Sequence, residues 1–415
     1  MQTSAPIDEQ SSFLSIPKLV WILGCMMFCV NASFLMIYSY VGIYMKTLGM
    51  SMGWIGVVEG LVEASSYLMK LFSGMISDYL RRRKPVVVLG YTFIVISRVI
   101  FSLAGSVAPL VVARLLERIG NGIQSTPRDT LVADVSPPNR IGASYGLKRT
   151  LSQAGSLVGA LVGIGAMFWA GGNFETVFRI ATIPAFIAFL ILIFFVHDPK
   201  KLTHSAISAE IPLPAQKKRS ALLFSNLPEL GLPFWLLMLI TGIFMLSRFS
   251  ETFLALYAYD NFGLESTYAP LIMLTFNAGW CLSSYPVGVF ADRMNRYWFL
   301  AMGILFLILA DLCLASATSL TWVYVGCFFW GVQYGVTQNI FLSLIAEMVP
   351  SHLRGTGFGC YYVICAMSAY CADHLTGLLS QHYGQPTAFS TSGIIAIVSL
   401  FALVIITGYR SKWRL

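Results

Sequence analysis

The feature that most limits what this chain can fold into is a series of long apolar stretches without a single charged residue. A membrane core about 30 Å thick is crossed by about 20 mostly apolar residues in a helix. Of the residues in the chain, 57% are hydrophobic and only 11% are charged. In a soluble domain about 45–50% of residues are apolar and about 25% are charged. The sequence therefore predicts an all-α membrane protein. The uncharged stretches are 19–45, 150–174, 266–291, 312–346 and 384–409.

Hydropathy and turn signals predict twelve transmembrane helices in two six-helix bundles. Between the bundles lies a polar, proline-rich and lysine-rich stretch that is typical of a linker. The expected helices are 18–46, 52–77, 85–104, 107–133, 141–170, 175–196, 233–260, 265–290, 296–315, 319–346, 356–380 and 387–409. The expected units are an N-terminal segment 1–17, a bundle 18–196, a linker 197–232, a second bundle 233–409 and a tail 410–415.

Basic residues are distributed unevenly between the two sides of this predicted topology. The loops on the side of the two termini hold nearly all of them, and the opposite loops hold only Lys46 and Arg179. Because cytoplasmic loops carry the excess of Lys and Arg, both termini are predicted to be cytoplasmic in a multi-pass inner-membrane protein. The net charge of +8 is then a matter of topology, and no nucleic-acid partner is expected.

The two halves repeat each other. Gly74-Met-Ile-Ser-Asp78 recurs as Gly288-Val-Phe-Ala-Asp292, and Arg82 recurs as Arg296. Asp134 matches Glu347, and Gly142-Ala-Ser-Tyr-Gly matches Gly355-Thr-Gly-Phe-Gly. Duplicated bundles with a binding site between them are typical of secondary transporters.

These residues resemble the motifs of the major facilitator superfamily (MFS), over the whole chain. Its motif after the second helix reads G-x-x-x-D-[RK]-x-G-R-[RK], and here Gly74, Asp78, Arg82 and Arg83 occupy matching positions. A second copy follows the eighth helix, with Gly288, Asp292 and Arg296. The stretch from Arg114 to Gly122 is also similar to the fourth-helix motif R-x-x-Q-G-x-G of the drug–proton antiporters, with Glu117 and Arg118 as departures.

The resemblance implies a conformational latch on the cytoplasmic side. Glycines would allow close helix approach, Asp78 would face a helix N-terminus where an anion is favoured, and Arg82 would pair with Asp134. The second half would repeat the pairing with Arg296 and Glu347. The alternative is that the arginines only set the topology. The expected latch residues are Gly74, Asp78, Arg82, Asp134, Gly288, Asp292, Arg296 and Glu347.

Ionisable residues at membrane depth are costly and usually functional. On a helical wheel, Arg114, Arg118 and Arg128 form one polar stripe of the fourth helix. The resemblance implies that helices 1, 4, 7 and 10 line a central cavity, which would then be cationic and aromatic and suited to an anionic organic solute. The alternative is that Glu117, Arg118, Arg248 and Glu251 only pair with one another. The expected substrate-binding residues are Arg114, Arg118, Arg248, Asn31, Tyr38, Trp330, Tyr334 and Gln338.

Three glutamates are candidates for proton coupling, in the order Glu251, Glu63 and Glu59. Glu251 lies one turn from Arg248 in the seventh helix, so substrate binding at Arg248 could release Glu251 to take up a proton. Glu59 and Glu63 share a stripe of the second helix and lack a local partner. With Asp373-His374 of the eleventh helix they could form a gate, a proton relay or simple polar packing.

No phosphate-binding glycine loop, metal-ligand cluster or nucleophile constellation is apparent, so we expect no enzyme activity and no cofactor. The leading hypothesis is a monomeric, proton-coupled carrier of a small organic anion, such as a carboxylate metabolite or a siderophore. A drug–proton antiporter that exports amphipathic compounds is the second. A non-transporting membrane receptor or channel is the alternative from another class.

Overall fold

The computed structural model describes residues 16–80, 82–137, 140–198, 227–290, 295–338, 340–350 and 353–412. Within these ranges the regular secondary structure is helical. The chain is an all-helical membrane protein. Seven of the described helices are long and apolar enough to cross a membrane by length and composition. The helices α2 and α4 are not among the seven, and they carry many of the charges at membrane depth.

The first half contains six long helices that follow the expected ranges closely. Asn173 caps the last of them by accepting a hydrogen bond from the Thr176 N–H, and Pro127 lies inside the fourth without ending it. The six are α1 (Lys18–Thr47), α2 (Met52–Leu80), α3 (Lys84–Leu103), α4 (Val107–Val135), α5 (Ile141–Trp169) and α6 (Phe174–Phe195).

The second half differs from the expectation at two helices. The helix predicted over 233–260 is two helices separated at 247–251. The one predicted over 319–346 is also two helices, the first ending at Thr337 and the second beginning at Ile340. The expected linker 197–232 lies largely outside the described residues. The elements are η3 (Leu227–Leu230), α7 (Gly231–Leu246), α8 (Thr252–Phe262), η4 (Ser266–Tyr268), α9 (Pro270–Phe290), α10 (Arg296–Ala315), α11 (Leu320–Thr337), α12 (Ile340–Met348), α13 (Arg354–His382) and α14 (Gln385–Lys412).

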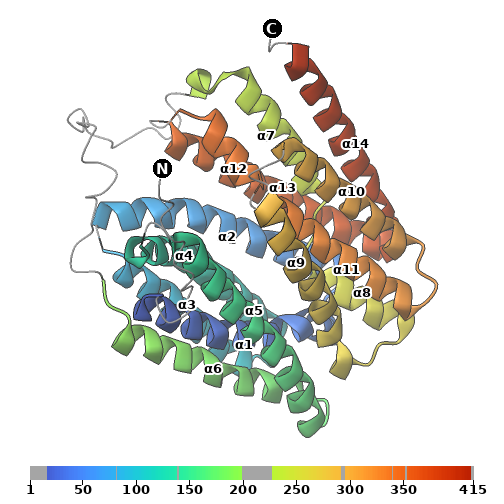
Figure 1. Cartoon of the computed structure of the whole chain (residues 1–415). Helices are drawn as coiled ribbons and strands as arrows, with labels where there is room; N and C mark the ends of the chain where they lie inside the picture. Colours follow the sequence, from blue (N-terminus) through green and yellow to red (C-terminus); the bar gives the residue numbers. More distant parts are fainter. Residues whose placement is uncertain are drawn as a thin grey trace, which may run out of the picture.

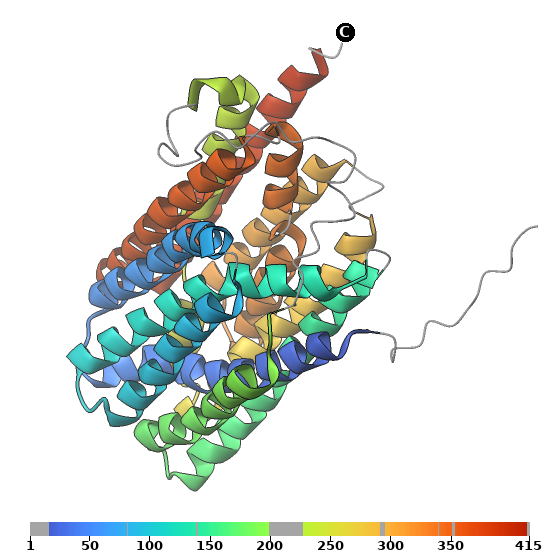
Figure 2. The ribbon, with the colours of Figure 1, turned by 90° about the vertical axis from the view of Figure 1, so that its left-hand side faces the viewer.

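The helices of the two halves gather into two groups, coloured blue to green and yellow to red in Figures 1 and 2. The most extensive packing between the groups is that of α2 against α13. In addition, α1 contacts α8 and α9, and α5 contacts α9. We call the end of the bundle with the connections 48–51, 104–106 and 170–173 the short-loop end. The opposite end, which includes residues 82–83 and 196–198, is called the linker end.

The halves lie closest together near the short-loop end, where glycines of α2 face the backbone of α13. A Cβ placed on Gly56 would lie 2.9 Å from the Gly377 Cα, and one on Gly60 would lie 2.9 Å from the Tyr370 carbonyl oxygen. At the linker end, a Cβ on Gly142, Gly146 or Gly355 would meet nothing within 4 Å. Small residues allow helix backbones to approach closely within membranes, and Gly56 and Gly60 allow that approach between the halves at the short-loop end.

Candidate functional site

The break between α7 and α8 is held open by side chains from two other helices. Residues 247–251 leave backbone groups without helical partners, and such groups must be satisfied inside a membrane. The Ser250 N–H donates to Asp373 Oδ1 at 2.5 Å, and Ser392 Oγ donates to the Ser247 carbonyl at 2.6 Å. Asp373 lies on α13 and Ser392 on α14, so the break depends on tertiary contacts.

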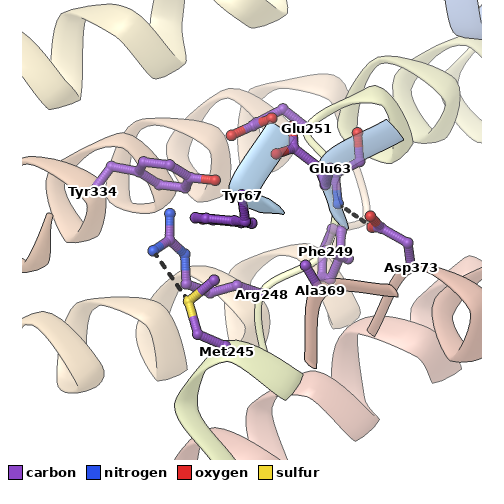
Figure 3. A pocket seen from close by; sticks show the side chains of 10 residues that line it. Glu63, Tyr67, Met245, Arg248, Phe249, Glu251, Tyr334, Ala369 and Asp373 are labelled. Atoms are coloured by element: carbon purple, nitrogen blue, oxygen red, sulfur yellow. Dashed lines mark hydrogen bonds between the residues drawn. The ribbon is translucent and has the colours of Figure 1, made fainter. Parts of the chain in front are cut away.

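A cavity lies beside this break, between the two halves (Figure 3). Its walls combine aromatic rings with charged groups. The Arg248 guanidinium stacks over the Tyr334 ring, with its central carbon 3.7 Å from the ring centroid. The lining residues are Glu63, Tyr67, Met245, Arg248, Phe249, Ser250, Glu251, Tyr334, Ala369 and Asp373.

The charges at the cavity differ in whether a partner neutralises them. The Arg118 guanidinium lies 2.8 Å from Glu63 Oε1, and Asp373 accepts the Ser250 N–H. Among the described residues, no salt bridge reaches Arg248 or Glu251. Glu251 Oε2 instead accepts a hydrogen bond of 2.6 Å from the Tyr38 hydroxyl. Arg248, Glu251 and Asp373 are therefore the charged groups of this cavity that no described salt bridge neutralises.

Arg114 is at the centre of a buried ion-pair network rather than at the cavity surface. Its Nε and Nη2 donate to the two carboxylate oxygens of Glu59, at 3.0 and 2.9 Å, and its Nη1 donates to Glu117 Oε2 at 2.9 Å. Arg98 of α3 lies 2.5 Å from the other oxygen of Glu117. All four side chains are at most 1% exposed, so the network fixes α2, α3 and α4 to one another.

This arrangement corrects the expectation of a cationic cavity. Arg114 and Arg118 are neutralised by Glu59 and Glu63, and the expectation that these glutamates lack a partner is wrong. A helical wheel places charges on a stripe but does not show which stripe of a neighbouring helix they face. The cavity itself presents three carboxylates and one guanidinium.

Hydrogen bonds from Ser250 and Tyr38 connect the halves at this site, and the two hydroxyls also lie 3.3 Å apart. Ser250 Oγ donates to Glu59 Oε2 at 2.7 Å, which attaches the break to the buried network of the first half. The second is the bond from Tyr38 of α1 to Glu251. The break, which belongs to the second half, is therefore bonded directly to α1 and α2 of the first half.

The other predicted substrate-binding residues are divided between the cavity and the packed interior. Tyr334 lines the cavity and Tyr38 reaches it through Glu251. Asn31 bonds to Ser152 Oγ and joins α1 to α5. Trp330 is fully buried and donates to Asp311 Oδ1 at 3.1 Å, and Gln338 is exposed at the interruption that follows α11. Those three do not line the cavity.

The predicted latch residues are only partly within the described structure. Arg296 pairs with Glu347 as expected. In the first half, Asp134 pairs with Arg83 at 3.3 Å, and the predicted pairing with Arg82 is wrong. Asp198 accepts a hydrogen bond from the backbone N–H of Arg83. The Arg83 side chain lies between Asp134 and Ser77 and contacts both. Asp292 and the side chain of Asp78 lie outside the described residues.

Of the glycines of the expected latch, Gly74 does not line the cavity. A Cβ on Gly74 would lie 3.3 Å from Thr126 Cγ2, so Gly74 allows α2 to approach α4 within the first half. Gly288 lies in α9, and its surroundings are not described.

Sequence reasoning missed Tyr67, Met245, Phe249, Ser250 and Ala369 as cavity residues. Tyr67 lies one turn after Glu63 on the stripe of α2 already identified, and that spacing could have indicated it. Met245, Phe249 and Ser250 enter the cavity because helix 7 is broken there, and no glycine or proline in 247–251 signals the break. Among the described residues, no group of three or more His, Cys, Asp or Glu residues could hold a metal ion.

Two pseudo-symmetric helical bundles with a charged cavity between them, beside a broken helix, define the class of secondary transporters. Residues 20–372 match the family model of the Major Facilitator Superfamily. The chain belongs to this superfamily, and it is a multi-pass membrane transporter of a small solute rather than an enzyme.

Several known proteins resemble this chain over nearly its whole length. An uncharacterized MFS-type transporter from Methanocaldococcus jannaschii is 25% identical over 396 residues, covering 94% of this chain and 95% of its own. The quinolone resistance protein NorA of Staphylococcus aureus is 24% identical over 402 residues, covering 96% and 98%. The structure of the nucleoside transporter NupG superposes with a TM-score of 0.74 at 14% identity, covering 94% and 99%, and supports the fold alone.

Proposed function

We propose that this transporter is a proton-coupled carrier that moves a small organic acid across the cytoplasmic membrane by alternating access. Arg248 is the observation that carries this proposal. Its guanidinium lines the cavity, has no salt bridge among the described residues and stacks on the Tyr334 ring. An arginine can bind a carboxylate through two parallel hydrogen bonds. Carboxylate metabolites and carboxylate siderophores are the favoured solutes.

The orientation in this proposal places the linker end in the cytoplasm, with both termini there. The distribution of basic residues supports it, since Arg82, Arg83, Lys84 and Arg140 all lie at that end and cytoplasmic loops are enriched in Lys and Arg. A fluorescent reporter that matures only in the cytoplasm, fused after residue 415, should be bright in intact cells. A dark fusion with normal expression would reverse the orientation.

Glu251 remains the first candidate for proton coupling. It lines the cavity beside Arg248 and bonds to Tyr38 of the other half, so a change of its charge would affect both the solute site and a contact between the halves. Glu63 and Glu59 are the weaker candidates, because their carboxylates are engaged by Arg118 and Arg114. The paired charges at the linker end, Arg83–Asp134 and Arg296–Glu347, are retained in this proposal as parts of the latch.

Uptake into proteoliposomes under an imposed pH gradient tests the proposal. The purified protein should accumulate organic acids from a panel of carboxylates, and Arg248→Gln should abolish that accumulation. Glu251→Gln should keep solute exchange and lose gradient-driven accumulation. The matched control is Glu175→Gln, whose carboxylate pairs with Arg179 at the short-loop end. Accumulation by Glu251→Gln with unchanged dependence on pH would exclude Glu251 as the coupling residue.

Export of amphipathic drugs is the second candidate function, and the similarity to NorA favours it. In the same vesicles, a carrier of this kind would transport quinolone antibiotics in exchange for protons and would ignore simple organic acids. That result would replace the first proposal.

A further inference from the structure

We propose that the solute is a zwitterion, with its carboxylate on Arg248 and its ammonium group on Glu251. This inference rests on the proposed function of carrying an organic acid, and it narrows the substrate class. The argument is one of charge complementarity within the cavity. A site that presents an unpaired guanidinium and unpaired carboxylates is matched by a ligand that carries both charges.

Arg248 is kept available for a ligand. Its buried Nε has no hydrogen-bond partner, and its Nη1 makes only a long contact of 3.9 Å with Met245 Sδ. The arginines of α4 that neighbour the site differ, since Arg114 and Arg118 are each paired with glutamates. A buried donor without a partner is costly, and a ligand carboxylate would supply the missing acceptor.

Glu251 offers the complementary charge. Its carboxylate receives a hydrogen bond from Tyr38, and no described cation forms a salt bridge with it. Glu63 and Asp373 also line the cavity, so a solute that was only an anion would lie among three carboxylates. An ammonium group at Glu251 would relieve that repulsion. A solute that was only a cation would leave Arg248 unmatched.

The rings that lie beside the two charged groups restrict the chemistry of the ligand. Figure 3 shows Tyr334 and Tyr67 lying beside the Arg248 guanidinium, with Glu251 on the other side of these rings. Phe249 adds a further ring to the wall. The aromatic walls suit an amino acid with an apolar or aromatic side chain.

The test uses matched sets of compounds that differ only in charge. Phenylalanine and leucine are the zwitterions, their N-acetyl derivatives are the anions and their amides are the cations. Binding to the purified transporter is measured from the rise in melting temperature and from competition in a counterflow assay. We expect the zwitterion of a set to bind best. Removing either of its charges should weaken binding by about tenfold, as expected for the loss of one charge-assisted contact.

Two variants make the test specific to each end of the ligand. With Glu251→Gln, the N-acetyl anion should bind as tightly as the zwitterion, because the ammonium group no longer has its partner. With Arg248→Gln, the amide should bind as tightly as the zwitterion. Glu175→Gln should keep the wild-type order, and the melting temperature without ligand checks that each variant is folded.

The outcomes separate this inference from the proposed function. If the anions bind wild type as tightly as the zwitterions and Glu251→Gln changes nothing, the zwitterion inference is overturned and the organic-acid carrier stands. If the amides bind best, both are overturned. If no member of either set binds while acids of the carboxylate panel are accumulated, the zwitterion inference is overturned and the organic-acid carrier stands.

Discussion

The two halves of the molecule use the same pair of positions for different chemistry. In the first half, Arg98 of α3 forms a buried ion pair with Glu117 of α4. In the second half the equivalent positions, 213 residues later, are Asp311 of α10 and Trp330 of α11, and they are joined by a hydrogen bond of 3.1 Å. The duplication has kept the contact between the two helices and changed the side chains that form it.

Each pair also reaches the first helix of its own half. Arg98 Nε donates to Ser33 Oγ of α1 at 2.9 Å, and α1 is continuous there. Asp311 Oδ2 and the Ser247 carbonyl, at the start of the break in helix 7, each lie 2.6 Å from Ser392 Oγ and share its single hydroxyl hydrogen. In the first half, a buried ion pair thus contacts a continuous helix. The second half uses the equivalent pair to hold a non-helical segment beside the cavity.

The largest expected effect comes from breaking the charged pair. Glu117→Gln leaves Arg98 buried without a counter-ion and removes one of the two glutamates that bind Arg114. Breaking a buried ion pair from one side costs about 3–5 kcal/mol, so we expect a loss of that size in the free energy of unfolding. Unfolding by sodium dodecyl sulfate in mixed micelles measures it. A loss below about 1 kcal/mol would show that the first half does not depend on this pair.

A smaller loss is expected at the equivalent acid of the second half. Asp311→Asn keeps the shape of the side chain but leaves only one acceptor oxygen for two donors, the Trp330 Nε1–H and the Ser392 hydroxyl. A buried polar group that loses its partner costs about 1–3 kcal/mol. The same unfolding assay measures this, with Ser392→Ala as a variant that removes one of the two donors. Equal losses for Asp311→Asn and Glu117→Gln would contradict the difference between the halves.

Trp330→Phe should cost less again. The ring would still pack on Phe249 and Tyr334, while the hydrogen bond to Asp311 would be lost. A single such bond contributes about 0.5–1.5 kcal/mol, and part of the indole volume is lost as well. Solute binding should be retained, because Trp330 does not line the cavity. A variant with normal stability and abolished binding would instead place Trp330 in the solute site.

The smallest effect is expected from an ion pair that belongs to neither of these two contacts. Lys46 and Asp260 lie 2.5 Å apart near the short-loop end, with side chains 39% and 17% exposed. Exposed ion pairs contribute about 0–1 kcal/mol. Asp260→Asn should therefore leave unfolding nearly unchanged at low salt and unchanged at high salt. A loss as large as that of Asp311→Asn would mean that this contact between the halves stabilises the fold.

Much of the fold could be predicted because its physical cause is local. Lipid requires long apolar helices, and the helix expected over 107–133 is α4, Val107–Val135. The break in helix 7 could not be predicted in this way, since Asp373 and Ser392 hold it from more than 100 residues away.

The site was predicted only in part for a similar reason. The stripes of α2 and α4 were apparent from spacing, and Arg248, Glu251 and Tyr334 were identified as candidates. Which glutamate neutralises which arginine depends on the rotation of two neighbouring helices about their axes. One sequence does not specify that rotation, so Arg114 was expected at the cavity and is buried beside Glu59.

The glycines of α2 that face α13 have a kinematic consequence. At Gly56 and Gly377 the two backbones already touch, with no side chain left between them to compress. The two groups of helices therefore cannot come closer at the short-loop end, so this contact acts as a mechanical stop. Any rocking of one half against the other must start from here by separation, and the linker end is where the remaining travel lies.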